Sequence, residues 1–286
     1  IFYAFKIIHL SKKGVNMKKI AFYGKGGIGK STTAANVSAA LSTAGHKVCQ
    51  IGCDPKNDST RLLLGHICKN TVLDMVRIKD EINLEDIVHY GFNGIKCVEA
   101  GGPEPGVGCA GRGIIVALEK LQELDAAADE DIILYDVLGD VVCGGFAVPI
   151  REGYATDIYI VSSGELMSLY AANNNAKGIR RFAGRGEVKL AGIIGNGRNV
   201  PNEENLLRTF AEKINTRIVA FIPRDKIVNL AEINRKTVIE WDPTSKQAQV
   251  YAALATEIFQ NTQLSIPKPL SFEELEDLIG FFGIDN

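Results

Sequence analysis

The sequence predicts an α/β fold, with a mostly parallel, doubly wound sheet in a single domain. From Lys18 onward, short apolar runs alternate with longer segments of helical periodicity. The apolar runs are nearly continuous, which is typical of strands buried on both faces of a parallel sheet. A glycine-rich stretch, GKGGIGKS, separates the first apolar run from the first helical segment. These observations together indicate helices on both faces of the sheet and a loop built for an anion at one end of it.

The expected strands follow the apolar runs, in chain order at 19–24, 47–52, 94–100, 131–136, 157–163, 188–196 and 217–223. The clearest helical patterns lie between them at 31–45, 113–124 and 165–183. We expect residues 17–270 to form one domain. Residues 1–16 show no link to this pattern and are read as an upstream leader before Met17. The tail, 271–286, has an apolar periodicity near 272–282 and is expected to pack on the same domain as a last helix.

Composition excludes several classes of function. The chain has 286 residues, of which 46% are hydrophobic and 23% charged, and its formal net charge is -2. Its charges are spread along the sequence, so no basic surface for nucleic acid is expected. No apolar run approaches the roughly 18 residues of a membrane span. The six cysteines include no CxxC pair, and we expect reduced thiols in a cytoplasmic protein. Four of these thiols are read as structural: Cys49, Cys53, Cys68 and Cys97.

The stretch GKGGIGKS matches the Walker A pattern GxxxxGK[ST] of P-loop NTPases, in the required place between a strand and a helix. Lys30 is expected to reach the outer phosphates and the Ser31 hydroxyl to bind magnesium. Lys25, directly after the first glycine, is the mark of the deviant Walker A ATPases. It could reach the nucleotide of a second subunit in a face-to-face dimer, as an arginine finger does. The glycines that let backbone N–H groups face phosphate are Gly24, Gly26, Gly27 and Gly29.

Carboxylates follow two of the expected strands. Asp54 and Asp58, with Lys56 between them, come after the second strand, at the edge where doubly wound sheets bind ligands. Asp54 is a candidate to orient the attacking water, and Asp58 to contact a magnesium-bound water. Read alone, the same loop is also compatible with a helix cap and a turn. Asp136 ends the run IILY as a Walker B acid would, and Asp140 follows it in a segment that can sense the γ-phosphate.

Two cysteines stand apart from the others. Cys109 lies in a loop rich in glycine and proline, and Cys143 is followed by two glycines. Both precede expected helices, where the helix dipole favours a thiolate. A [4Fe-4S] cluster takes four thiolates, so a symmetric dimer would supply the pair that one chain lacks. Zinc is chemically permissible at the same thiolates, but the closeness of Cys143 to Asp136 favours iron-sulfur. Arg112 opposes the helix dipole, which suggests an anionic cluster or an acidic partner beside it.

With these motifs in hand, the sequence resembles the nitrogenase iron protein family from about Met17 to its C-terminus. The stretches that carry the resemblance are GKGGIGKSTTAAN, GCDPKNDSTRLLLG, CVEAGGPEPGVGCAGRG, YDVLGDVVCGGFAVPIRE and SGELMSLYAANN. The resemblance implies a homodimeric ATPase bridged by one [4Fe-4S] cluster. Such a protein takes electrons from a ferredoxin or flavodoxin and passes them singly to a larger partner while hydrolysing MgATP.

The resemblance also assigns residues. It places Thr32 with the phosphate site, Asp54, Lys56 and Asp58 in one switch, and Asp136 and Asp140 in a second. It makes Cys109 and Cys143 the cluster ligands and Arg112 a docking-surface arginine, which some organisms modify by ADP-ribosylation. Positions that surround the adenine are matched by Asn196, Pro223, Asp225 and Gln247.

Some positions depart from the common pattern of the family. Gly195 and Ser162 stand where a cysteine is frequent, Asn57 replaces an alanine, and the segment 65–92 diverges. These departures leave the electron acceptor open, because the family includes reductases that serve tetrapyrrole-reducing enzymes. Two further alternatives are a partitioning ATPase without a cluster and an iron-sulfur carrier.

Overall fold

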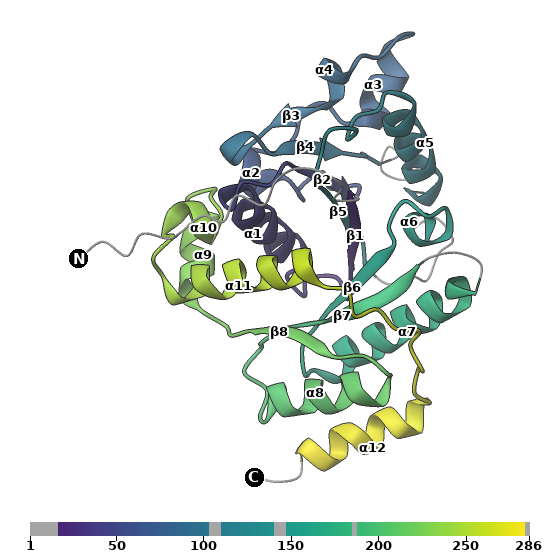
Figure 1. Ribbon diagram of the computed structural model, residues 1–286, viewed down its shortest axis with the longest axis vertical. Coiled ribbons are helices and arrows are strands. Elements are labelled where there is room, and N and C mark those ends of the chain that lie inside the picture. The colour runs from purple at the N-terminus through teal and green to yellow at the C-terminus, as the bar shows by residue number, and fades with distance from the viewer. Residues whose placement is uncertain (1–16, 103–109, 140–146, 185–187, 284–286) are drawn as a thin grey trace.

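The computed structural model describes residues 17–102, 110–139, 147–184 and 188–283 (Figure 1). Within these ranges, one sheet has the strand order β3-β4-β2-β5-β1-β6-β7-β8. All neighbouring strands pair in parallel except β3 and β4, which are antiparallel. The strands are β1 (Lys18–Tyr23), β2 (Val48–Cys53), β3 (His89–Tyr90), β4 (Lys96–Glu99), β5 (Ile132–Val137), β6 (Asp157–Ser162), β7 (Lys189–Asn196) and β8 (Ile218–Ile222).

Helices cover both faces of this sheet (Figure 1). The longer ones are α1 (Lys30–Thr43), α5 (Ala110–Glu123), α7 (Leu166–Ala183), α8 (Glu203–Lys213), α9 (Lys226–Ile233), α11 (Lys246–Gln260) and α12 (Phe272–Gly283). Short helical turns occupy the connections: α2 (Arg61–Leu64), α3 (Val72–Ile78), α4 (Leu84–Ile87), η1 (Phe92–Gly94), α6 (Val148–Arg151) and α10 (Val238–Trp241).

The two faces of the sheet explain the continuous apolar runs. Side chains alternate across a strand, so Ile20 and Phe22 of β1 join one core, together with apolar residues of α1 and α11. Ala21 and Tyr23 of the same strand join the other core, together with residues of α5, α7 and α8. Successive residues of a strand are therefore buried in opposite cores, one on each face of the sheet. This arrangement confirms the doubly wound α/β class.

All the expected strands are present, and so are the four helical patterns named from the sequence. The expected elements did not include β3, a two-residue antiparallel strand at the edge of the sheet. They also lacked the short helical turns and the helices α8, α9 and α11. In the part of the chain that the structure describes, no helix is long and apolar enough to cross a membrane.

The C-terminal helix α12 packs against α7 and α8. The connection that leads to it is fixed by Asn173 of α7, whose Nδ2 donates to Leu270 O at 2.8 Å and whose Oδ1 accepts from Leu270 N at 2.9 Å. The helix α12 therefore packs on the helices that cover this face of the sheet.

Candidate nucleotide-binding site

The loop between β1 and α1 has a backbone that requires glycine. Gly24, Gly27 and Gly29 have φ values of 145°, 74° and 98°, which L-residues rarely adopt. A Cβ on Gly24 would lie 2.1 Å from Val161 O, and one on Gly29 would lie 2.4 Å from Asn196 Nδ2. The first turn of α1 carries no acidic residue. The loop thus presents an uncompensated helix N-terminus, which favours a bound anion.

Lys30 begins α1 and is only 7% exposed. Its Nζ donates to Lys25 O at 3.5 Å, so its side chain folds back over the loop. Ser31 follows it and lies close enough to Asp136 for its hydroxyl to lower the pKa of that carboxyl. The fold therefore brings the lysine and the serine of the Walker pattern to the same acid.

Asp136 lies in β5 and is 2% exposed. Burial raises its pKa, although the Lys30 charge and hydrogen bonds from Ser31 and Ser59 act in the opposite direction. Its Oδ1 is buried with no hydrogen-bond partner in the described part of the chain. A carboxylate oxygen without a partner, next to a serine hydroxyl, is a donor set that suits magnesium. The residues present therefore fit the Mg²⁺ of MgATP.

The segment 54–60 runs from the end of β2 to α2. Asp54 Oδ1 accepts from Lys56 N at 2.9 Å, and Asn57 adopts a left-handed φ of 56°, so this part is a tight turn. Thr60 is the N-cap residue of α2 and has no side-chain cap bond to it. Asp54 therefore lies in a turn, one of the two alternatives that the sequence left open. The N-cap residue of α2 is Thr60, so neither Asp54 nor Asp58 has that role. Asp54 and Asp58 are both partly exposed at the sheet edge.

Sequence reasoning missed Glu99, at the end of β4. It is fully buried, and its Oε1 accepts from both N and Oγ1 of Thr60 at 2.7 Å. Its pKa is raised to about 8, mainly by burial; the charges of Asp136 and Asp58 add to this rise, and the hydrogen bonds from Thr60 oppose it. The sequence feature that could have revealed it is an acidic residue inside the apolar run GIKCVEA.

A second part of the site is a pocket of about 510 Å³ beside the loop. It brings together all four residues that the sequence assigned to the adenine, namely Asn196, Pro223, Asp225 and Gln247. Gly27, Gly29 and Thr32 of the phosphate loop and helix α1 also line it, so the pocket is continuous with the phosphate loop. A nucleotide with its phosphates on the loop can therefore place its base in this pocket.

Three polar side chains of this pocket form hydrogen bonds to the protein itself. Asn196 Nδ2 donates to Ile28 O at 2.6 Å, and Gln247 Nε2 donates to Pro223 O at 3.3 Å. Asp225 caps α9 by accepting from Ile227 N at 2.9 Å.

Two residues that line the pocket, Glu232 and Arg198, were missed by sequence reasoning. Glu232 Oε1 accepts from Thr32 Oγ1 at 2.7 Å, and Arg198 Nη2 donates to Gly27 O at 2.6 Å. Arg198 is two positions after Asn196 in the stretch GNGRN, which was the available signal.

The predicted cluster ligands Cys109 and Cys143, and Asp140 of the second switch, lie outside the described residues. Helix α5 begins at Ala110, directly after Cys109, and Arg112 on its first turn is exposed. The other four cysteines are buried. Burial raises the pKa of Cys49 to about 12 and that of Cys68 to about 11, and it raises the pKa values of Cys53 and Cys97 as well. These four thiols are therefore protonated and inert.

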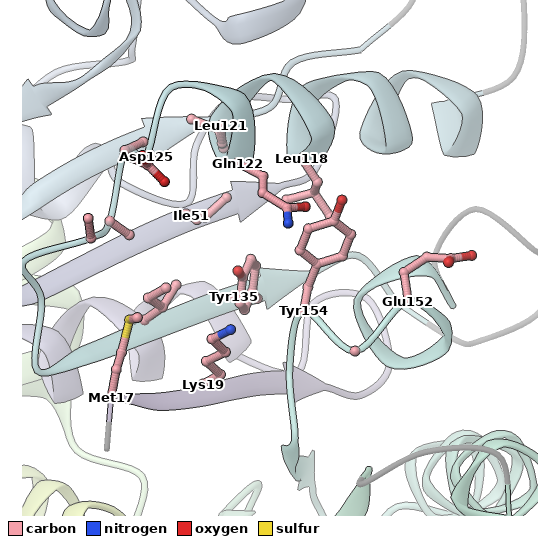
Figure 2. A pocket seen from close by; sticks show the side chains of 15 residues that line it. Met17, Lys19, Ile51, Leu118, Leu121, Gln122, Asp125, Tyr135, Glu152 and Tyr154 are labelled. Atoms are coloured by element: carbon pink, nitrogen blue, oxygen red, sulfur yellow. The ribbon is translucent and has the colours of Figure 1, made fainter. Parts of the chain in front are cut away.

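A separate cavity of about 230 Å³ lies between α5 and the sheet (Figure 2). Lys19 and Tyr135 rise from the sheet, Leu118 and Leu121 come from α5, and Tyr154 stands between α5 and α6. No residue assigned from the sequence to the nucleotide or to the cluster lines this cavity. It is thus distinct from the nucleotide site.

The phosphate loop with its second lysine and the buried acid at the end of β5 define a P-loop ATPase of the deviant Walker A kind. Solved structures share this fold. MinD from Pyrococcus horikoshii, complexed with MgADP, is 23% identical with a TM-score of 0.67, over 85% of this chain and 97% of that chain. A variant of McdA from Cyanothece, in complex with ATP, is 17% identical with a TM-score of 0.63, over 93% of this chain and 98% of that chain.

The chain belongs to the NifH/frxC family of 4Fe-4S iron-sulfur cluster binding proteins, whose sequence profile matches residues 18–285. A nitrogenase iron protein from Methanospirillum hungatei is 59% identical over 266 residues, covering 92% of this chain and 95% of that protein. The chain is thus an ATP-hydrolysing oxidoreductase of the nitrogenase-reductase type, with a 4Fe-4S cluster and MgATP as cofactors. The likeness to MinD concerns the fold, so it gives no support to the partitioning alternative.

Proposed function

We propose that the protein is a homodimer with one [4Fe-4S] cluster held between its subunits. In this proposal the dimer passes single electrons to a larger nitrogenase component and hydrolyses MgATP as it does so. A ferredoxin or flavodoxin supplies the electrons. The observation that carries the proposal is the 59% identity to a nitrogenase iron protein across 92% of the chain.

In the proposed site, the backbone N–H groups of the phosphate loop and Lys30 hold the phosphates of ATP. Ser31 and the Asp136 carboxylate would hold magnesium, with Asp58 beside them. Asp54 orients the attacking water. Lys25 acts in the other subunit's site, where its charge stabilises the transferred phosphoryl group. Asn196, Pro223, Asp225 and Gln247 surround the adenine, and the shared pocket that they line supports this assignment.

Coupling between ATP and the cluster is assigned to the segment that follows β5. Asp136 stands at its start and Cys143 comes shortly after, so a change at the phosphates is transmitted along one short stretch of chain. For a one-electron couple, about 59 mV corresponds to a tenfold ratio. A shift of roughly 100 mV in the cluster potential would therefore require about 50-fold tighter nucleotide binding to one redox state.

The cluster assignment is tested by iron content after anaerobic purification. We expect a brown protein with about four iron atoms per dimer. Cys109→Ser and Cys143→Ser should each abolish the iron and leave MgATP binding intact. Cys68→Ser, at a buried thiol, is the matched control and should keep the iron. A colourless wild-type protein without iron would instead favour the partitioning ATPase.

The partner is tested by electron transfer from the reduced protein to a purified nitrogenase component. Transfer that requires MgATP supports the proposal. Its absence, together with transfer to a tetrapyrrole-reducing enzyme, would make the protein a nitrogenase-like reductase of the same family. Release of the cluster to an apo-protein without electron transfer would support an iron-sulfur carrier. Arg112→Glu should weaken transfer to the true partner, because Arg112 is exposed and follows the proposed cluster ligand Cys109 by three positions in the sequence.

A further inference from the structure

A buried carboxyl group with no assigned role lies beneath the segment 54–60. Glu99 Oε1 accepts two hydrogen bonds from Thr60, whereas Oε2 has no hydrogen-bond partner among the residues that the structure describes. A buried carboxyl oxygen without a partner destabilises the fold. The two donors of Thr60 account for Oε1, but no hydrogen bond among the described residues accounts for the second buried oxygen.

Residues before and after the turn at 54–58 pack on this carboxyl group. At the start, a Cβ on Gly52 would lie 1.9 Å from Glu99 Oε2 and 2.7 Å from the Cβ of Ser59. At the end, Thr60 donates its N–H and its hydroxyl to Glu99 Oε1. One side chain thus contacts the residues on either side of the turn that carries Asp54 and Asp58.

A second buried side chain fixes the neighbouring residue. Gln50 of β2 donates from Nε2 to Ser59 O at 2.9 Å and to Ser59 Oγ at 3.1 Å. Its Oε1 accepts from Ser38 of α1 at 2.8 Å, so the amide cannot turn away without losing a bond. Ser59 also lies close enough to Asp136 for its hydroxyl to lower the pKa of that carboxyl. Ser59 and Thr60 therefore connect the strands β2 and β4 to the acid on the magnesium side of the site.

We infer that Glu99 is a positioning residue for MgATP. By holding Thr60 in place, its carboxyl group sets where Asp58 and Ser59 lie relative to Asp136. The inference rests on the proposed function, because it requires that Asp58 and Asp136 face the magnesium of MgATP. Glu99 itself contacts neither the nucleotide nor the metal. Its effect should therefore appear in the contribution of magnesium to ATP affinity and not in the affinity for ATP alone.

The experiment compares the dissociation constants of ATP measured by calorimetry with excess Mg²⁺ and with EDTA. The ratio of the constant in EDTA to the constant with Mg²⁺ is the gain in ATP affinity that magnesium provides, called the magnesium gain below. Glu99→Ala should lower this gain by about tenfold while the constant in EDTA changes by less than about threefold. Glu99→Gln keeps an oxygen acceptor for Thr60 and should restore the gain to within about threefold of the wild type.

The matched control is Glu130, whose side chain is 6% exposed and pairs with Lys96 at the other end of β4 at 3.0 Å. Glu130→Ala also removes an inward carboxylate, but far from Thr60, and should leave the gain unchanged. Thr60→Val keeps the shape of a fully buried side chain and removes only the hydroxyl donor. It should lower the gain by about threefold, with Thr60→Ser restoring it, and it tests the inference if Glu99→Ala does not fold.

The possible outcomes separate the inference from the proposed function. If wild-type protein binds no MgATP, the proposed function is wrong and the inference falls with it. In another outcome, the wild type binds MgATP while Glu99→Ala and Thr60→Val show the same magnesium gain as the control Glu130→Ala. In that case the positioning role of Glu99 is wrong and the proposed function stands. If Glu99→Gln is as weak as Glu99→Ala, Glu99 does not act as an acceptor for Thr60. A selective loss of the gain, rescued by glutamine, supports the inference.

Discussion

The phosphate side and the base side of the nucleotide site differ in how their polar groups are satisfied. On the phosphate side, Asp136 Oδ1 and Glu99 Oε2 are buried with no hydrogen-bond partner in the described residues. On the base side, Asn196, Asp225 and Gln247 all bond to the protein itself. Burial raises the pKa of both phosphate-side acids, whereas the base-side groups lie in an open pocket lined by polar residues.

Because of this difference, substitutions on the two sides should have different effects on folding stability and on nucleotide affinity. Unpartnered carboxylates in the phosphate side weaken the fold and favour a cation, so changes there should affect binding strongly and can even stabilise the protein. The base side is assembled by its own hydrogen bonds, so changes there should alter folding and binding together by small amounts. The predictions that follow test this contrast, beginning with the largest expected effect.

Replacing Lys30 by methionine should weaken MgATP binding by about 1,000-fold, or roughly 4 kcal/mol. Lys30 is nearly buried and supplies the charge that most lowers the pKa of Asp136. Without it, both the phosphates and the acid lose their cation. Equilibrium binding of a fluorescent ATP analogue measures the effect. Lys19→Met, at the other end of β1 beside the separate cavity, is the control and should bind like the wild type. A loss of less than tenfold for Lys30→Met would contradict the assignment of the phosphate loop.

The second prediction concerns stability against pH in the absence of nucleotide. The pKa of Glu99 is raised to about 8, mainly by burial, so the folded state binds its proton more tightly than the unfolded state. That contribution to stability is complete below the unfolded pKa and is lost as pH rises through the folded value. Between about pH 6 and about pH 9, the wild type should lose about 3 kcal/mol relative to Glu99→Gln.

Denaturant titrations of the two proteins at several pH values measure this difference. All other ionisable groups are the same in the two proteins, so their contributions to this difference cancel to first order. A difference that stays constant with pH would show that Glu99 is not a buried acid of raised pKa. The unpartnered oxygen on this side of the site would then not destabilise the fold as proposed.

Asp136→Asn should have opposite effects on binding and on stability. Its pKa is raised overall, so the folded state disfavours the charged form despite Lys30. Removing the charge should stabilise the nucleotide-free protein by about 1 kcal/mol. The same change should weaken MgATP binding by about tenfold and leave magnesium-free ATP binding unchanged. Thermal unfolding and calorimetry measure the two effects. Destabilisation together with unaltered MgATP binding would remove the contrast between the two sides.

The sequence predicted the fold and the phosphate loop because both depend on local features. Gly24 and Gly29 are recognisable since only glycine tolerates their backbone and their close contacts. The apolar runs predicted the strands, because each residue is buried on one face or the other. The edge strand β3 has only two residues and forms through pairing with β4, so no local pattern reveals it.

Glu99 and Gln50 could not be assigned from the sequence for a different reason. Their partners, Thr60 and Ser59, are reached only because β4 lies beside β2 in a particular register, with Gln50 opposite Cys97 and Gly52 opposite Glu99. The base-side residues were assigned through the family resemblance, since β7, β8 and α11 meet at one pocket only in the folded chain. The roles of Cys109, Cys143 and Asp140 stay predictions, because these residues lie outside the described part of the chain.

Asp225 tests the base side with the smallest expected effect. Its carboxylate caps α9 through Ile227 N and also lines the base pocket. Asp225→Ala should lose about 1 kcal/mol of stability with the cap and weaken ATP binding by about fivefold. Asp225→Ser keeps an oxygen that can cap the helix but removes the carboxylate, so stability should stay near that of the wild type while ATP affinity still falls. Thermal unfolding and calorimetry on the two variants separate the roles. If Asp225→Ser binds ATP like the wild type, the carboxylate serves only as a cap, and the bonds of the base side are structural in origin.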